Sequence, residues 1–463
     1  MAYLLTILVY AAAQIGLGVW VARGARSSGE FFVAGRRLGP GLLFATFLAA
    51  NIGSGSTIGA TGLGYRDGMA AVWWVGSAGL GSVALALWVG PRVRRIAADH
   101  DLKTTGDFLE WRYDARVRAT IAALLWVGTV AILAGQFIGI AWILNVVAGI
   151  PRFAGCAIGA VLVTTYFAAG GLRSSAIVNV VQLSVKLLGF AVALPLVLHV
   201  VGGIDGLHAA VRDPAMWNPW RHGRSGWIYA AMLAPNFVIS PGLLQKVYGA
   251  RDDRAVRVGI GLNAVCLLAY AVVPVLLGLS ALTLHPGLPN QELALPMLFV
   301  HDLPFWVGAL GLAAVFSAET SAADAILFML ATSLSQDLYK RFVNPKATDR
   351  QVVTVARVAS VAGAAAALGV AFLSKTIVDA LAVFYTLVGV GLFVPVIAGL
   401  YWRRPRPLDA LAAVAGGVVT VVAVQLSSGG TSIGLFTPAV CGLAVSAAAF
   451  LGVSLAFSRR GQS

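Results

Sequence analysis

Three ionisable residues stand inside long apolar runs of this 463-residue sequence, namely Lys186, Glu319 and Asp324. If those runs cross a bilayer, a charge at their centre costs at least about 2.5–3.5 kcal/mol on insertion scales, so each needs a partner. Lys186 could form a buried ion pair with Asp324 or Glu319, or it could lie near a cation path and modify coupling. Asp324 could be a hydrogen-bonding hub or a cation ligand. Glu319 could line an aqueous path or pair with a backbone donor.

Helical spacing sorts these polar residues onto faces. Asn179, Gln182 and Lys186 recur at i, i+3 and i+7, which places them on one face of a helix. Ser321 and Asp324 share one face of another helix, and the other acid of that run lies more than a quarter turn away. The sequence therefore predicts two facing helices with polar stripes, and the candidates for a role in coupling are Lys186, Asn179, Gln182 and Glu319.

Two stretches combine helix-breaking residues with polar groups inside apolar runs. Residues 49–57 read Ala-Ala-Asn-Ile-Gly-Ser-Gly-Ser-Thr, and residues 234–242 read Ala-Pro-Asn-Phe-Val-Ile-Ser-Pro-Gly. Irregular backbone at membrane depth is tolerated only where it lines a cavity, and its freed carbonyls suit a cation. The pair of breaks therefore favours a solute site, although small residues also serve close helix packing alone.

The composition defines the elements that must position these residues. Hydrophobic residues make up 59% of the chain and charged residues 11%, and the mean hydropathy is +0.85. These values exclude an ordinary soluble enzyme, a disordered chain and a coiled coil, and they predict an all-α polytopic membrane protein. A hydropathy window gives about 13 transmembrane helices, at 2–22, 41–63, 70–91, 118–148, 153–170, 176–201, 226–249, 255–283, 304–336, 351–373, 376–401, 408–427 and 431–457.

The basic residues predict the orientation. With these spans, 25 of the 33 lysines and arginines fall in one set of alternating loops or their flanks and six in the other. Basic loops stay in the cytoplasm, so the N-terminus is predicted outside and the C-terminus inside. The net charge of +14 is therefore explained by basic loops that set the orientation of the chain in the membrane, and we expect no nucleic-acid partner. Cys156, Cys266 and Cys441 are scattered in apolar runs without metal-binding spacing.

The two broken spans each begin a set of five, which predicts an inverted five-plus-five repeat. The expected organisation is an extra helix and loop at 1–40, the first repeat at 41–201, an external loop at 202–225, the second repeat at 226–401, and two further helices with a short tail at 402–463. No appended soluble domain is expected.

The chain resembles the sodium:solute symporter family from about Phe31 to Trp402. The resemblance is carried, in order, by Phe32-Val33-Ala34-Gly35-Arg36, Ala49-Ala50-Asn51-Ile52, Gly64-Tyr65, Thr105-Gly106-Asp107-Phe108-Leu109-Glu110, Arg112-Tyr113, Gly170-Gly171-Leu172-Arg173, Gln182, Leu244-Gln245-Lys246 and Asp337-Leu338-Tyr339-Lys340. It implies a core of the leucine-transporter type. It also implies a sodium ion held by the carbonyls of Ala49, Ile52 and Ala318 and by the Ser321 hydroxyl.

The sequence departs from the family at this implied site. Ala322 stands where a second hydroxyl is usual, and Asn179 where an aspartate is usual. Asp324 stands where some relatives place a serine of a second sodium site, so the resemblance makes it a further candidate ligand. A lysine in the position of Lys186 could also replace the ion, as a lysine does in some proton-coupled transporters that share the core.

The substrate site is less clearly defined. The candidates are Asn51, Ser56, Thr57, Trp73, Trp74, Asn236 and Ser240. The scarcity of acidic and amide side chains among them favours a compact organic acid or amino acid over a sugar.

These features predict a sodium-coupled symporter of a small organic solute, with a proton-coupled or ion-independent carrier as the alternative. A transport-like sensor would need an output domain, and an enzyme would need a nucleophile–base or metal constellation; neither is evident. The expected partners are the solute and the lipid bilayer, with no organic cofactor and no obligate protein partner. The expected location is the plasma (inner) membrane of a bacterium.

Overall fold

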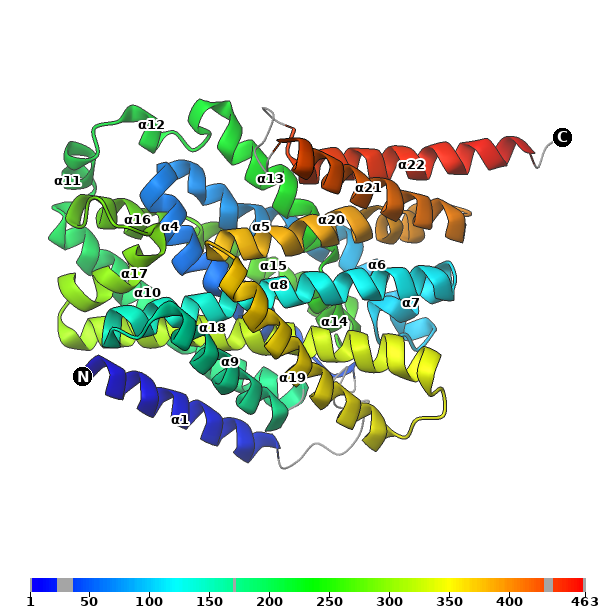
Figure 1. The fold of residues 1–463 in the computed structure, drawn as a ribbon, viewed down its shortest axis with the longest axis horizontal. Coiled ribbons are helices and arrows are strands. Elements are labelled where there is room, and N and C mark those ends of the chain that lie inside the picture. Colours follow the sequence, from blue (N-terminus) through cyan, green and yellow to red (C-terminus); the bar gives the residue numbers. More distant parts are fainter. Residues whose placement is uncertain (1, 23–35, 170–171, 429–435, 461–463) are drawn as a thin grey trace.

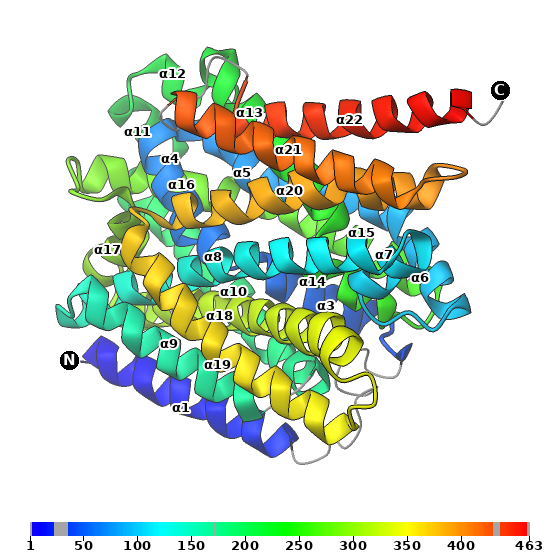
Figure 2. The same cartoon turned by 45° about the vertical axis from the view of Figure 1, so that its right-hand side comes forward.

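A computed structural model describes residues 2–22, 36–169, 172–428 and 436–460, and these fold into a bundle of helices (Figure 1). An isolated parallel bridge joins Leu38 to Ala250, and the described residues are otherwise almost entirely helical. The segments 32–35 and 170–171, which carry part of the family resemblance, lie outside the described residues. Helix α1 lies along one side of the bundle, and α21 and α22 lie together on the opposite side (Figures 1 and 2).

The helices follow the predicted apolar runs closely. Their bounds are α1 Ala2–Ala22, α3 Pro40–Asn51, α4 Ile58–Asp67, α5 Val72–Ala84, α6 Gly90–Asp99, α8 Ala115–Ala148, α9 Arg152–Ala169, α10 Leu172–Val200, α13 Arg221–Ile239, α14 Pro241–Tyr248, α15 Asp253–Tyr270, α16 Val272–Leu284, α18 Phe305–Thr332, α19 Asp349–Leu373, α20 Ile377–Tyr401, α21 Pro407–Ser428 and α22 Pro438–Arg460. Among the described residues, ten helical segments are long and apolar enough to cross a membrane, and three shorter apolar helices accompany them. The count of 13 spans, the orientation and the domain boundaries remain predictions.

The first predicted break is present between α3 and α4. Helix α3 ends at Asn51, and Ile52 turns into an extended conformation with φ −96° and ψ 91°. A short 3-10 turn, Ser54–Ser56, precedes α4. A Cβ atom on Gly53 would lie 2.5 Å from the Ala322 Cβ, so this crossing with α18 needs a glycine.

The second predicted break lies between α13 and α14. Helix α13 ends at Ile239, and Ser240 adopts φ −51° and ψ 123° before Pro241 starts α14. Because Pro241 has no N–H to continue the helical ladder, the helix is interrupted here. The far end of α14 is tied to the start of α3, since Leu38 N donates to Gly249 O at 3.0 Å and Arg251 N donates to Leu38 O at 3.0 Å.

The loops contain helices that hydropathy does not detect. Helix α6 continues to Asp99, and α7 (Thr105–Arg112) follows it; the 202–225 loop contains α11 (Gly203–Ala210) and α12 (Pro214–Trp217), and the 284–303 loop contains η5 (Gln291–Leu293), α17 (Ala294–Met297) and η6 (Leu298–Asp302). Helix α7 begins with a capping box, in which Thr104 and Asp107 satisfy each other's backbone donors. Such caps stabilise short polar helices that an apolar window passes over.

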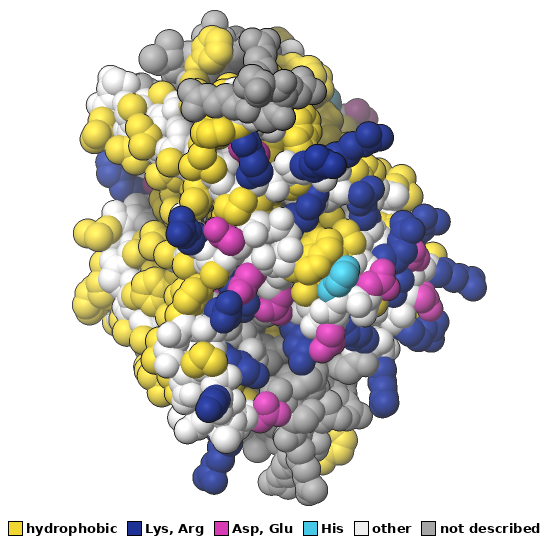
Figure 3. Space-filling view, turned by 90° about the vertical axis from the view of Figure 1, so that its right-hand side faces the viewer, with side chains coloured by type: hydrophobic (Ala, Val, Ile, Leu, Met, Phe, Trp, Pro, Cys, Tyr) yellow, Lys and Arg dark blue, Asp and Glu magenta, His cyan; other side chains and the backbone are white. Residues whose placement is uncertain are grey.

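Lysine and arginine side chains cover the end of the molecule where α6 and α7 lie (Figure 3). Beneath them, Arg118 of α8 is only 6% exposed and binds three carboxylates: Asp107 at 2.9 Å, Glu110 at 2.8 Å and Asp337 at 2.8 Å. Burial alone would raise the pKa of Glu110, but hydrogen bonds from Arg341 and Arg118 outweigh it and hold that pKa below its usual value. This network joins α7, α8 and the segment after α18.

Candidate functional site

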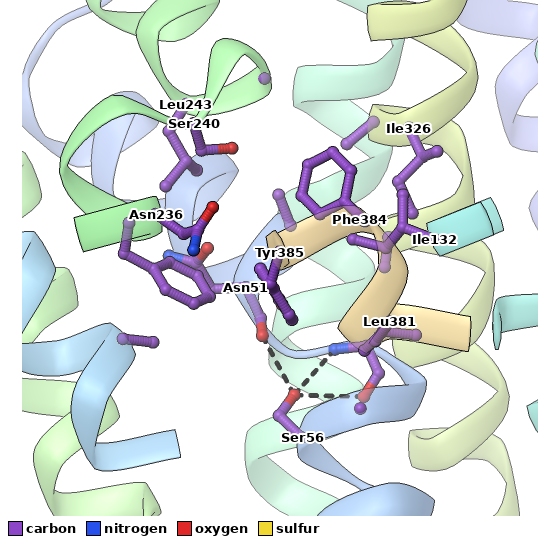
Figure 4. A pocket seen from close by; sticks show the side chains of 18 of the residues that line it. Asn51, Ser56, Ile132, Asn236, Ser240, Leu243, Ile326, Leu381, Phe384 and Tyr385 are labelled. Carbon is purple, nitrogen blue, oxygen red and sulfur yellow. Dashed lines mark hydrogen bonds between the residues drawn. The ribbon is translucent and has the colours of Figure 1, made fainter. Parts of the chain in front are cut away.

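A cavity lies between the two broken helices and is completed by α5, α8, α18 and α20. Its volume is about 820 Å³, counting the open space at its mouth. Four of the predicted substrate residues line it: Asn51, Ser56, Asn236 and Ser240 (Figure 4). Trp74 and Tyr385 contribute aromatic surface to the same wall. The breaks therefore do border a cavity, which is the condition for irregular backbone at membrane depth.

Hydrogen bonds hold the first break in shape. The Ser56 hydroxyl lies 3.0 Å from Asn51 O and accepts from Gly53 N at 3.0 Å (Figure 4). Trp74 Nε1 donates to Gly55 O at 2.8 Å. Gln136 of α8, which the sequence reasoning missed, accepts from Ser54 N at 3.0 Å. These polar groups satisfy backbone atoms that the interrupted helix leaves unpaired.

Asn236 presents an unsatisfied acceptor. Its Nδ2 donates to Met232 O at 2.6 Å, whereas its Oδ1 is buried without a hydrogen-bond partner. Since Asn236 lines the cavity, Oδ1 is available to a donor on a bound solute.

Two predicted substrate residues are not in the cavity wall. Trp73 stacks on Trp220, with ring centroids 4.6 Å apart, because adjacent positions on a helix point about 100° apart and Trp74 takes the inward direction. Thr57 points away from the cavity, where its hydroxyl bonds Gly53 O at 3.0 Å and Glu319 Oε1 at 3.2 Å. Neither residue lines this cavity, and a role of either in solute binding stays a prediction.

The oxygens implied for sodium do come together, but around a nitrogen. Lys186 Nζ donates to Ala49 O at 2.9 Å, Ile52 O at 3.2 Å and Ser321 Oγ at 2.8 Å. The Ser321 hydroxyl also lies 3.2 Å from Ala318 O. The ammonium thus uses all three of its donors on the oxygens that the resemblance assigned to the cation.

The predicted ion pairs of Lys186 are absent. Among the described residues no oxygen of Glu319 or Asp324 forms an ion pair with its ammonium. Asp324 interacts electrostatically with the ammonium of Lys246, whose Nζ donates to Thr46 O at 3.0 Å. Carbonyls freed by the break are nearer to Lys186 than either acid, and sequence spacing cannot reveal that.

The count of basic residues above includes Lys246 among the loops and their flanks, but its side chain is buried within the bundle. It lies in α14, is only 4% exposed, and is the sole charged side chain among the described residues lining the cavity. It stands three residues before the predicted end of its span, close enough to be counted with the basic loop. The sequence did single out this lysine, because the Leu244-Gln245-Lys246 motif is one of the segments that carry the family resemblance.

The remaining coupling candidates lie outside the cavity. Gln182 Nε2 bonds Thr320 Oγ1 at 3.1 Å and Gln14 Oε1 at 3.3 Å, which links α10 to α18 and α1. Asn179 is buried on the same face. Glu319 is fully buried and bonds the Thr57 hydroxyl; none of its recorded partners is a backbone donor.

A buried acid, Glu292, holds the loop between α16 and α18 against the bundle. Glu292 Oε1 accepts from Ile377 N, the first residue of α20, at 2.5 Å, and Oε2 accepts from Trp142 Nε1 of α8 at 2.8 Å. Burial raises the pKa of Glu292 to about 7 from its ordinary value of 4.5, although these hydrogen bonds and Arg152 oppose the rise and Asp379 adds to it. The loop is therefore docked through a carboxyl group that titrates near neutrality.

We expect this docking to strengthen as the pH falls from 7 to about 4.5. Docked Glu292 binds a proton in that window and released Glu292 does not, so the docking equilibrium shifts by up to about tenfold per pH unit. Hydrogen–deuterium exchange of residues 288–297, corrected for intrinsic rates, should become slower towards acid pH. Glu292→Gln should abolish this dependence, and an equal pH response in that variant would contradict the assignment.

Many apolar helices, two aligned breaks and a shared cavity define an integral membrane transporter rather than an enzyme. The family model of the sodium:solute symporter family matches residues 31–417, so the chain belongs to this family.

Its relatives carry different solutes. The sodium/pantothenate symporter of Escherichia coli K12 is 29% identical over 448 residues, covering 92% of this chain and 91% of the relative. The sodium/glucose cotransporter of Vibrio parahaemolyticus is 25% identical over 458 residues, covering 89% and 82%. The fold is similar to that of a Na⁺-coupled sialic acid symporter in a substrate-bound outward-open state, with a TM-score of 0.85, 16% identity and 98% of both chains covered.

Proposed function

We propose that this protein is a secondary active symporter in a bacterial plasma membrane, which carries a small organic solute with a monovalent cation by alternating access. The observation that carries the proposal is the cavity between the two broken helices, because unwound backbone there offers both solute and ion ligands. Family membership and the sodium-coupled relatives support sodium as the cation.

The cavity chemistry favours a compact organic acid or amino acid. Lys246 supplies a positive charge, and Ser240 is the N-cap residue of α14 at the cavity. Asn236 Oδ1 is a hydrogen-bond acceptor without a partner among the described residues. A carboxylate suits the first two groups, and a hydroxyl or amino group suits the third. Trp74 and Tyr385 bound an apolar portion of the solute.

The contacts of Lys186 favour a second candidate function, in which sodium is not the coupling ion. Its ammonium takes the oxygens of the family's sodium site, so a proton-coupled or ion-independent carrier of the same fold is the alternative. Uptake into proteoliposomes of a panel of organic acids, amino acids and sugars, under a sodium gradient, a proton gradient or neither, separates these candidates. Accumulation driven by sodium supports the first. Accumulation driven only by protons, or counterflow without accumulation, supports the second.

Asn236→Leu is expected to raise the KM for the transported solute by about tenfold, the effect of losing one buried hydrogen bond worth about 1.4 kcal/mol. Trp73→Phe is the matched control, because that side chain stacks outside the cavity wall. Initial rates of uptake in proteoliposomes, normalised to protein amount, provide the measurement. Equal KM values for Asn236→Leu and the unchanged protein would remove Asn236 from the solute site.

A further inference from the structure

We propose that Glu319, with the hydroxyls of Ser54 and Thr57, holds a sodium ion on the opposite side of the helix break from Lys186. The inference rests on the cation coupling proposed above and gives the cation a place other than the family's usual site. Glu319 follows Ala318 directly on α18, but its side chain leaves the helix in a different direction from that of Ser321.

The Glu319 carboxylate has too few partners for a buried charge. Its exposure is 0%; among the described residues Oε1 accepts from the Thr57 hydroxyl at 3.2 Å, and Oε2 has no hydrogen-bond partner there. A carboxylate inside a membrane protein requires a proton, a metal ion or a basic group. The nearest basic group is Lys186, but its three donors are spent on other oxygens and no ion pair joins the two within 4 Å.

The surroundings of the carboxylate supply further oxygen ligands. The Ser54 hydroxyl is fully buried, lies close to Glu319 and has no completed hydrogen bond. Thr57 places its hydroxyl against the carboxylate from the start of α4. The Tyr270 hydroxyl is also buried without a hydrogen-bond partner among the described residues, and it interacts electrostatically with Glu319. Sodium is a hard cation that prefers such carboxylate and hydroxyl oxygens.

Helix α8 leaves room for this carboxylate only because residue 139 is glycine. A Cβ atom on Gly139 would lie 2.7 Å from Glu319 Oε2 and 2.7 Å from the carboxyl carbon. The glycine thus lets the acid lie against the α8 backbone beside the break. Gly139 gives an independent way to disturb the site without changing any ligand.

Binding can be tested without knowledge of the solute. The full chain, purified in detergent, is titrated with NaCl against choline chloride at constant ionic strength, and its thermal unfolding is followed. We expect saturable stabilisation by sodium, with the half-saturating concentration raised at least about tenfold in Glu319→Gln. Asp409→Asn, which alters a buried acid of α21 that is not a candidate ligand, should keep the unchanged half-saturation.

A second pair of variants tests the geometry. Gly139→Ala should weaken sodium stabilisation, whereas Gly128→Ala on the same helix should not, because a Cβ there would meet only Phe384 and Val388. The proposal is overturned if sodium does not stabilise the unchanged protein. It is also overturned if the half-saturating sodium concentration is the same in Glu319→Gln as in the unchanged protein. Loss of the stabilisation in Asp409→Asn alone also overturns it. Solute uptake driven solely by protons, with no sodium binding, would leave the symport proposal standing while refuting this site.

Discussion

Lys186→Ala should bind an additional sodium ion at Ala49 O, Ile52 O and Ser321 Oγ. In the unchanged protein the ammonium satisfies these three oxygens, at 2.9, 3.2 and 2.8 Å. Removing it leaves buried carbonyls unpaired and leaves the negative charge of Glu319 without its nearest basic neighbour. A sodium ion restores both the oxygen contacts and the charge.

Equilibrium binding of radioactive sodium to the purified variant measures this gain. Ser321→Ala in the Lys186→Ala background should raise the dissociation constant of the added ion by about tenfold, because one of its few ligands is lost. Lys186→Met is the matched control. Methionine also removes the charge, but it fills much of the space of the lysine, so it leaves less room for the added ion than alanine does. Equal sodium binding by Lys186→Ala and the unchanged protein would show that the family's site no longer accepts the ion.

Arg118→Met should be the most destabilising single change at the basic end of the molecule. It leaves Asp337, whose side chain is only 6% exposed, without its guanidinium partner at 2.8 Å. Breaking a buried ion pair from one side costs about 3–5 kcal/mol, so we expect a large loss of thermal stability and of folded protein in the membrane.

Arg341→Met is the control for this change. Arg341 also binds Glu110, at 2.6 Å, but its side chain is 46% exposed, so its loss should cost no more than about 1 kcal/mol. Thermal unfolding of both variants in the same detergent gives the comparison. Similar losses for the two arginines would contradict the distinction between a buried network and a surface pair.

Helix positions were largely predictable from the sequence, because long apolar runs and breakers act locally. The runs at 376–401 and 118–148 correspond to helices Ile377–Tyr401 and Ala115–Ala148. Gly53 and Pro241 marked where two helices are interrupted, since their backbone properties do not depend on distant partners. Short capped helices such as Thr105–Arg112 were missed because polar caps, not apolar length, stabilise them.

The contacts of the site were less predictable, because they depend on which distant atoms are nearest. Lys186 was placed on the polar face of its helix, but its long side chain reaches carbonyls rather than the acids expected to pair with it. Trp73 and Trp74 are chemically identical, and only the packing of α5 decides which one meets the cavity. Lys246 was missed because a basic residue near a span end usually belongs to a loop.

The bridge between Leu38 and Ala250 has a mechanical consequence. Its two backbone hydrogen bonds join the start of α3 to the segment directly after α14. These half-helices belong to different predicted repeats, yet neither can swing outward at this end without pulling the other or breaking the bridge. While the bridge holds, the two half-helices must move together at this end, and cross-linking residues 38 and 250 should leave any such joint movement intact.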